Sequence, residues 1–488
     1  MSSFTADETG MHAEPILLAG QSAEGRGEAI AVIDPSNGEK IGMAGTASPA
    51  QVGEAVEKGL AALKDSGWAS WQPHKRAAVL YRIAAEIERN LDAIADLQMR
   101  ENGKTQAESK GQAQSAAGTF RYYASVCETL QDEMPPARGD YISMTVHEPL
   151  GVVAALTPWN SPLTMAAQKI APALAAGNAI VLKPAETTSL VSLALGRCCA
   201  AGGLPDGLIS VLPGRADVGS ALVEHPSIGC ISFTGGTATG QHIAKGAAAR
   251  LIPVILELGG KSPHIVFADA DLKAAAQAVA SGIFGGTGQS CVAGSRLFVE
   301  ASIVEPFEAL LLEEAAATRV GPPTDPASVI GPLSSFLHRD RVEAYVSASL
   351  GEGARVLCGG KRPTGGSFAN GAYYLPTILA GLDNRSTIAQ EEIFGPVLCM
   401  MQFQTEEDLI AQANDSVYGL AAGVWTLDYK RAWRVARALE AGTVWINTYK
   451  QLSIAAPFGG FKLSGLGREK GIHGLRAYQQ PKSVYWGL

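Results

Sequence analysis

The sequence predicts an α/β protein with parallel sheets, and three observations support that class. Its 488 residues exceed what one ordinary hydrophobic core accommodates, so two or three domains are expected. From about residue 151 to 270, short β-rich runs alternate with helical segments. A second alternating block extends from Asp271 to about Lys462. Strands and helices that alternate at this spacing predict βαβ units, whose helices cover both faces of a parallel sheet.

The predicted helices and strands can be assigned in order along the chain. The N-terminal MSSFTADETGMHAEPILL has early acidic residues and no basic region, which indicates a disordered lead-in rather than a signal peptide. Residues 48–112 are mostly helical by their 3.6-residue apolar periodicity. Residues 140–149 (DYISMTVHEP) alternate as a strand outside the main sheet. The first block then contains GVVAALTPW, NAIVLKPAE, LISVLPG, CISFTGG, PVILELGG and HIVFADA, and the second contains RLFVEA, VLCMMQF, GVWT and GTVWINT.

Composition excludes several classes of protein. A net charge of −8 disfavours binding to nucleic acid or to an anionic membrane surface. The uncharged stretches 149–168 and 274–295 contain prolines or many Gly, Ser and Gln residues, so we expect buried segments rather than membrane helices. Seven cysteines without a CxxC pair predict reduced thiols in a cytoplasmic protein, with no disulfide framework and no metal site.

Two residues stand out chemically. Glu257 lies in the apolar run PVILELGG, where a carboxylate is costly to bury unless it is paired or transfers protons. Cys291 lies among small, flexible residues in GGTGQSCVAGSR. Together they indicate a thiol nucleophile and a general base. The alternatives are that Glu257 is an ion-pair partner and that Cys291 is a small buried hydrophobe.

Polar motifs follow several of the predicted strands. They are TPWN after GVVAAL, KPAE after NAIVL and TGGTATG after CISF. Ligands of open parallel sheets bind at the carboxyl ends of strands, and a glycine-rich helix N-terminus can face a phosphate. Glu186 is positioned to accept both ribose hydroxyls of NAD, with Lys183 beside it. The alternative is a solvated Lys–Glu loop.

The motifs TPWN, KPAE, FTGGTATG, LELGGKSP, GQSCVAGSR, EEIFGPV and PFGGFKLSGLGRE occur in one order over more than 300 residues. In this order the sequence closely resembles the aldehyde dehydrogenase superfamily, from DPSNGE near residue 34 to the C-terminal AYQQPKSVYW. The resemblance implies an NAD(P)-dependent enzyme of the non-acylating type. Members that transfer the acyl group to coenzyme A typically lack the carboxylate at the position of Glu257. Its presence favours hydrolysis to the free acid.

The resemblance also implies roles for individual residues. Cys291 would attack the aldehyde, Asn160 and the Cys291 N–H would form the oxyanion hole, and Glu257 would activate water to hydrolyse a thioester. Lys169 and Glu469 match a proton relay, or form an ordinary ion pair. NAD, with NADP possible, would be bound by Thr157, Trp159, Lys183, Glu186, Gly235, Gly236, Gly240, Leu258, Glu392 and Phe394.

The aldehyde tunnel is the least specified part of the site. Motif matching assigns to it Arg121, Tyr122, Ser161, Met165, Gln168, Ser290, Val292, Lys450, Leu452 and Phe458. Several relatives have aromatic residues at positions 161, 168 and 452, and their absence here disfavours a trimethylammonium aldehyde. A bulky or polar aldehyde, aromatic or carboxylated, is expected instead. Lys450 either pairs with a substrate carboxylate or phenolate, or points to water.

The resemblance implies three structural parts and two competing functions. The parts are a Rossmann-type NAD-binding domain (1–126 and 150–259), a catalytic α/β domain (260–463) and a β oligomerisation arm with the C-terminal tail (127–149 and 464–488). A homodimer or homotetramer is expected, because exposed strand edges need a partner. The competing functions are a coenzyme A-acylating semialdehyde dehydrogenase and a non-catalytic structural or binding member.

Overall fold

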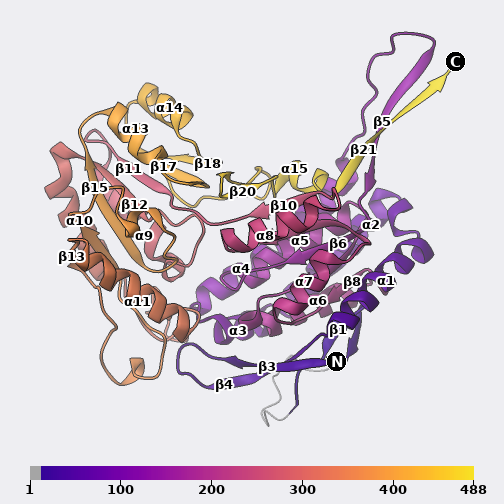
Figure 1. Ribbon diagram of the computed structural model, residues 1–488, viewed down its shortest axis with the longest axis horizontal. Coiled ribbons are helices and arrows are strands. Elements are labelled where there is room, and N and C mark those ends of the chain that lie inside the picture. Colours follow the sequence, from indigo (N-terminus) through magenta and orange to yellow (C-terminus); the bar gives the residue numbers. More distant parts are fainter. Residues whose placement is uncertain (1–11) are drawn as a thin grey trace.

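A computed structural model describes residues 12–488, and two large sheets organise it (Figure 1). The first sheet has the strand order β2-β1-β8-β7-β6-β9-β10-β20. Its strands are β1 (Ile16–Leu18), β2 (Gln21–Ala23), β6 (Val152–Leu156), β7 (Ala179–Lys183), β8 (Ile209–Val211), β9 (Ile228–Thr234), β10 (Val254–Glu257) and β20 (Gly465–Leu466). The five central strands β8-β7-β6-β9-β10 are parallel, whereas β1 and β20 pair antiparallel with them.

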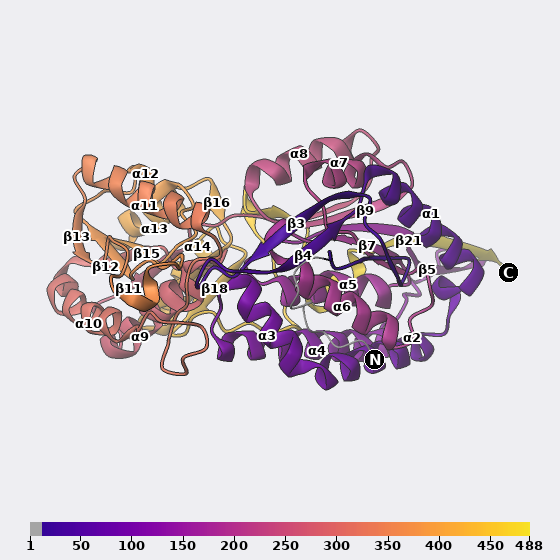
Figure 2. The same cartoon turned by 90° about the horizontal axis from the view of Figure 1, so that it is seen from below.

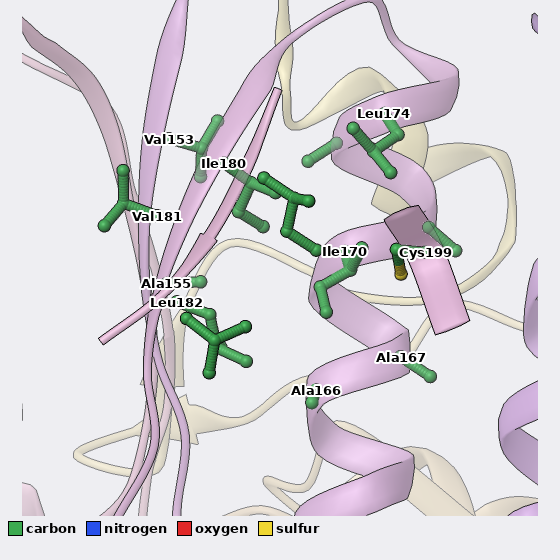
Figure 3. Packing of buried hydrophobic residues seen from close by; sticks show 14 of the residues in the cluster. Val153, Ala155, Ala166, Ala167, Ile170, Leu174, Ile180, Val181, Leu182 and Cys199 are labelled. Carbon is green, nitrogen blue, oxygen red and sulfur yellow. The ribbon is translucent and has the colours of Figure 1, made fainter. Parts of the chain in front are cut away.

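Helices cover both faces of this sheet. They are α1 (Pro49–Ser66), α2 (Pro73–Arg89), α3 (Leu91–Asn102), α4 (Gln106–Thr129), α5 (Pro162–Ala175), α6 (Ser189–Ala201), α7 (Ala216–Glu224) and α8 (Thr237–Ala248). Helices α2 to α6 lie on one face, and α1, α7 and α8 lie on the other (Figure 2). The packing of α5 on β6 and β7 joins Ile170 and Leu174 to Val153 and Ile180 (Figure 3), and all four side chains are buried. Burial of such side chains is the main stabilising contribution to this layer.

The second sheet has the order β13-β14-β15-β12-β11-β17-β18 and is parallel except at β13. Its strands are β11 (Pro263–Val266), β12 (Arg296–Glu300), β13 (Arg355–Cys358), β14 (Thr377–Ala380), β15 (Val397–Phe403), β17 (Ala421–Trp425) and β18 (Thr443–Ile446). Its helices are α9 (Leu272–Phe284), α10 (Val304–Ala317), α11 (Phe336–Gly351), α12 (Thr387–Gln390), α13 (Glu406–Asn414) and α14 (Tyr429–Ala438). The predicted α/β class with parallel sheets is confirmed.

Three two-stranded sheets and one short α-helix are the remaining strands and α-helices of the described chain. They are β3 (Gly27–Ile33) with β4 (Lys40–Thr46), β16 (Tyr418–Gly419) with β19 (Phe461–Lys462), β5 (Tyr141–Pro149) with β21 (Gln479–Gly487), and α15 (Gly471–Arg476). The β5–β21 ribbon projects away from the body of the molecule (Figure 1). The strand predicted at residues 140–149, outside the main sheet, is therefore confirmed.

One local prediction was wrong. Residues 16–18 were expected within a disordered lead-in, but they form the buried strand β1. Leu17 pairs with Val211 of β8, and the Ala19 N–H donates to the Ser210 hydroxyl at 2.8 Å, so this strand is stabilised by a segment about 190 residues away. Residues 1–11 of the predicted lead-in lie outside the described residues. Within the described chain, no helix is both long and apolar enough to span a membrane.

Candidate active site

The first sheet reverses its strand order between β6 and β9, where ligands of open α/β sheets bind. Thr157 follows β6 and Thr234 ends β9, and both side chains are buried. Neither hydroxyl has a hydrogen-bond partner among the described residues. A buried hydroxyl without a partner is costly, so this edge is suited to a polar ligand.

Glycines bring helix α8 close to the end of this sheet. A Cβ at Gly240 would lie 2.4 Å from the Leu258 side chain, so only glycine lets α8 pack this closely. A Cβ at Gly236, the residue before α8, would meet open space. Gly235 and Gly236 precede the N-terminus of α8. Backbone N–H groups are therefore available to a ligand at the edge of the sheet where the strand order reverses.

Glu257 ends β10 and is 3% exposed. Neither of its carboxylate oxygens accepts a hydrogen bond from a described residue. Burial and the neighbouring Glu469 raise the pKa of Glu257 well above its usual range, although Lys169, Arg468 and Lys470 act in the opposite direction. A Cβ at Gly459 would lie 2.8 Å from Glu257 Oε1, so glycine there leaves room for the carboxyl group.

A buried polar network lies behind Glu257. Lys169 Nζ donates to Glu469 Oε1 at 2.5 Å and to the Ser232 hydroxyl at 3.1 Å. The Tyr478 hydroxyl donates to the same Ser232 oxygen at 3.0 Å. Lys169 and Glu469, predicted as a relay or an ion pair, therefore form a fully buried ion pair within electrostatic range of Glu257.

Cys291 follows a tight turn, the 3₁₀ helix Gly285–Gly288, in which Gly286, Thr287 and Gly288 have left-handed backbone angles. A Cβ at Gly288 would lie 2.0 Å from the Gly395 carbonyl, and a Cβ at Gly260 would lie 2.4 Å from the Cys291 carbonyl. The turn is therefore held against two other segments. Burial, together with Glu392 and Glu257, raises the pKa of the Cys291 thiol to about 12. The resting thiol is protonated at neutral pH and needs a base before it can attack.

Asn160 lies beside this turn. Its Nδ2 donates to the Gln289 carbonyl at 2.9 Å, two residues before the cysteine. No described residue accepts a hydrogen bond from the Cys291 N–H. The Asn160 amide is thus held against the segment that carries Cys291.

The predicted nicotinamide-side residues meet in an aromatic cluster. The Trp159 ring lies 5.3 Å from that of Phe394 and 5.0 Å from that of His338. His338 Nε2 is 2.7 Å from the Phe394 carbonyl, and this contact supports Phe394 in its left-handed conformation. Glu392 Oε1 accepts the Gly260 N–H at 2.9 Å, which joins the EEIFGPV and LELGGK segments. No sequence motif marks His338 as part of this cluster.

At the other end of the candidate cofactor path, Lys183 Nζ donates to the Pro184 carbonyl at 3.1 Å. Burial lowers the pKa of Lys183, and Glu186 and Asp217 act against that shift. Glu186 is within 3.4 Å of Arg215, which precedes α7. No sequence motif marks Arg215, and its partner is 29 residues away.

The candidate substrate residues lie in several different environments. The Ser161 hydroxyl accepts from Gln112 Nε2 at 3.1 Å, Gln168 and Val292 are buried, and Phe458 lies beneath Lys470, whose Nζ is 4.8 Å from the ring centre. Met165, Ser290 and Tyr122 are partly buried, and Leu452 is exposed. Arg121 forms an exposed ion pair with Glu88, so its guanidinium is already paired at the surface of α4.

Comparison with known proteins now identifies the family. The model of the aldehyde dehydrogenase family matches residues 22–484. The chain belongs to the aldehyde dehydrogenase family. The predicted family and enzyme class are therefore confirmed: the protein is an oxidoreductase that acts on aldehydes.

Solved structures agree closely. The indole-3-acetaldehyde dehydrogenase AldA of P. syringae, crystallised as a mutant with NAD+ and IAA, is 38% identical over 98% of both chains, with a TM-score of 0.96. A betaine aldehyde dehydrogenase mutant from Staphylococcus aureus, complexed with NAD+, is 36% identical over 97% of both chains, with a TM-score of 0.95. The aldehyde dehydrogenase KauB from Pseudomonas aeruginosa is 37% identical over 97% of both chains, with a TM-score of 0.95.

Proposed function

We propose that this aldehyde dehydrogenase oxidises an aldehyde to the free acid with NAD, through a covalent cysteine adduct. The observation that carries the proposal is the convergence of three groups from distant parts of the chain. Glu257 ends a strand of the first sheet, Cys291 follows a tight turn, and Asn160 donates to that turn. Glu257 is near enough to Cys291 to raise the pKa of its thiol.

In the first step, the Cys291 thiol loses its proton and the sulfur attacks the aldehyde carbon. The raised pKa of the thiol means that a base must take this proton. Glu392 and Glu257 both act on this thiol, but Glu392 accepts the Gly260 N–H, whereas Glu257 accepts no hydrogen bond from a described residue and is the proposed base. The negative oxygen of the adduct would then accept hydrogen bonds from Asn160 Nδ2 and the Cys291 N–H. A neutral amide suits this role because it stabilises charge without titrating.

The site fits a dinucleotide. The partnerless hydroxyls of Thr157 and Thr234, the open space at Gly236 and the carboxyl groups of Glu186 and Glu392 would hold its phosphates and sugars. When bound, NAD supplies the acceptor for the hydride that leaves the adduct. The NAD complexes of the similar structures support this choice.

Glu257 would then remove a proton from the water that hydrolyses the thioester. Its buried, uncompensated carboxyl group has a raised pKa, as a general base that works near neutral pH requires. The Lys169–Glu469 pair lies within electrostatic range of Glu257 and would respond to the change of charge when that proton is taken up. Retention of Glu257 favours the free acid over transfer to coenzyme A, and retention of Cys291 argues against a non-catalytic member.

The substrate is proposed to be a bulky or polar aldehyde, aromatic or carboxylated. Ser161 accepts a hydrogen bond from Gln112, and Leu452 is exposed. Neither position therefore supplies an aromatic ring to surround a trimethylammonium group. The match to an indole-3-acetaldehyde dehydrogenase supports a substrate with an aromatic ring.

We also propose a homodimer or homotetramer assembled through the β5–β21 ribbon. Tyr485, Trp486 and Leu488 are exposed on it, and large exposed apolar side chains near a free strand edge favour association. Size-exclusion chromatography with light scattering tests this, and a monomer at micromolar concentration would contradict it. The seven cysteines are free, which is consistent with a reducing, cytoplasmic compartment.

The proposed function is tested by absorbance at the reduced-nicotinamide band. Purified protein is mixed with NAD or NADP and with aliphatic, aromatic and carboxylated aldehydes, and the acid product is identified with and without coenzyme A. Turnover with NAD to free acid, abolished in Cys291→Ala, is expected. An absolute need for coenzyme A, or silence across the panel with a reduced thiol, would contradict the proposal.

A further inference from the structure

Two lysine side chains flank the turn that precedes Cys291. Lys450 Nζ reaches the Gly285 carbonyl at 3.5 Å, the only hydrogen bond found for this ammonium among the described residues. Lys104 is 7% exposed, and its Nζ lies 3.4 Å from where a Cβ of Gly286 would be. No carboxylate of the described chain lies within 4.0 Å of either ammonium. The buried Lys104 and the partly buried Lys450 are thus without a direct counter-ion at one turn, which is rare for charges removed from water.

Among the described residues, Glu108 is the carboxylate that acts on both lysines, and it is already engaged. Glu108 Oε1 accepts the Gly286 N–H at 2.9 Å, and Oε2 accepts the N–H and hydroxyl of Thr105 at 3.0 and 3.2 Å. These bonds close the capping box at the start of α4 and fix the carboxylate away from an ion pair. Two lysines and one glutamate leave one net positive charge at the turn.

This charge lies within electrostatic range of the nucleophile. Lys450 and the Cys291 thiol each affect the pKa of the other. Lys450 follows Tyr449, whose hydroxyl donates to the Val292 carbonyl at 3.1 Å, so the lysine is anchored directly beside the nucleophile segment. The left-handed backbone at Lys450 fixes the direction in which its side chain leaves the chain.

We propose that Lys450 binds a carboxylate carried by the aldehyde substrate, at the end of the molecule opposite the reacting carbonyl. This inference rests on the proposed function, and it specifies the substrate class as monocarboxylated aldehydes. One net positive charge matches a monoanion, and Glu108 would repel a dianionic phosphate. Lys104 contributes positive potential to the same turn. A carboxylate would supply the counter-ion that the two ammonium groups lack.

The test compares matched aldehydes. With 4-carboxybenzaldehyde and methyl 4-formylbenzoate, the ring and reacting group are the same and only the charge differs. The wild type should favour the carboxylate in kcat/KM. Lys450→Met should lower kcat/KM for the carboxylate at least about 30-fold, as expected when a buried charge loses its partner. It should leave the ester within about threefold, because Met keeps the unbranched shape.

Lys110→Met is the control, since Lys110 is a half-exposed lysine on helix α4 that is paired with Asp92. The Lys110→Met variant should favour 4-carboxybenzaldehyde over the ester as strongly as the wild type does. A second measurement needs no turnover: in Cys291→Ala, calorimetry should show tighter binding of 4-carboxybenzaldehyde than of the ester, and Lys450→Met should abolish the difference.

The outcomes separate the two proposals. Oxidation of neutral aldehydes without any carboxylate preference, in turnover and in binding, would overturn the role of Lys450 and leave the proposed function intact. An equal loss for both aldehydes in Lys450→Met would also overturn it, because the lysine would then be structural. Failure to oxidise any aldehyde would instead remove the proposed function, and the calorimetric comparison would still decide the carboxylate preference.

Discussion

The buried ion pair between Lys169 and Glu469 should be a major determinant of stability. The two side chains are 0% and 3% exposed and 2.5 Å apart, and they connect α5 to the segment before α15. In Lys169→Met, Glu469 stays buried beside Glu257 without its cation. Removal of one partner of a buried pair costs about 3–5 kcal/mol, because the remaining charge loses its compensation. The Ser232 hydroxyl also loses the Lys169 donor, which places the expected loss in the upper part of this range.

The assay is urea unfolding followed by intrinsic fluorescence, with the free energy of the first cooperative transition compared between variants. Lys169→Met/Glu469→Gln is the matched control, since it removes both charges and should recover more than half of the loss. A loss below about 1 kcal/mol in Lys169→Met would refute the reasoning, because it would fall in the range of a surface pair. A double variant no more stable than the single one would refute it as well.

Three further predictions concern the site. Glu186→Gln should raise kcat/KM for NADP relative to NAD about tenfold or more, because a carboxylate that repels a 2′-phosphate is removed while Arg215 stays; an unchanged ratio in steady-state assays would contradict it. Gly459→Ala should slow thioester hydrolysis at least about tenfold, since a Cβ there would lie 2.8 Å from Glu257 Oε1; an unaltered kcat would show that the carboxyl group can move freely. Glu469→Gln should lower the pKa of Glu257, because Glu469 raises it. The acid limb of the pH profile for deacylation should then move to lower pH, and a shift to higher pH would be the wrong sign.

Much of the site could be predicted because its chemistry is local in sequence. Glu257 is conspicuous in an apolar strand, and Cys291 in a run of small residues, so each is recognisable without its neighbours. The parallel sheets were equally predictable, since a buried parallel strand is a continuous apolar run.

Other parts depend on contacts between distant segments. Strand β1 has three residues and is stabilised by pairing with β8, which no local pattern reveals. His338 packs on Trp159 across 179 positions, and Arg215 meets Glu186 only once α7 has folded. The partly compensated Lys104 was not recognised, because a lysine in a polar segment looks solvated until the turn at Gly286 covers it.

The central claim is that Cys291 carries the acyl group and that Glu257 releases it by hydrolysis. Its most direct test is rapid mixing of Glu257→Gln with NAD and an oxidisable aldehyde, followed by mass spectrometry of the quenched protein. The account predicts a burst of about one reduced nicotinamide per active site, slower than in the wild type because Glu257 no longer takes the Cys291 proton, then still slower turnover, with an acyl group on Cys291. Steady turnover without a burst, or an acyl group on another residue, would contradict it.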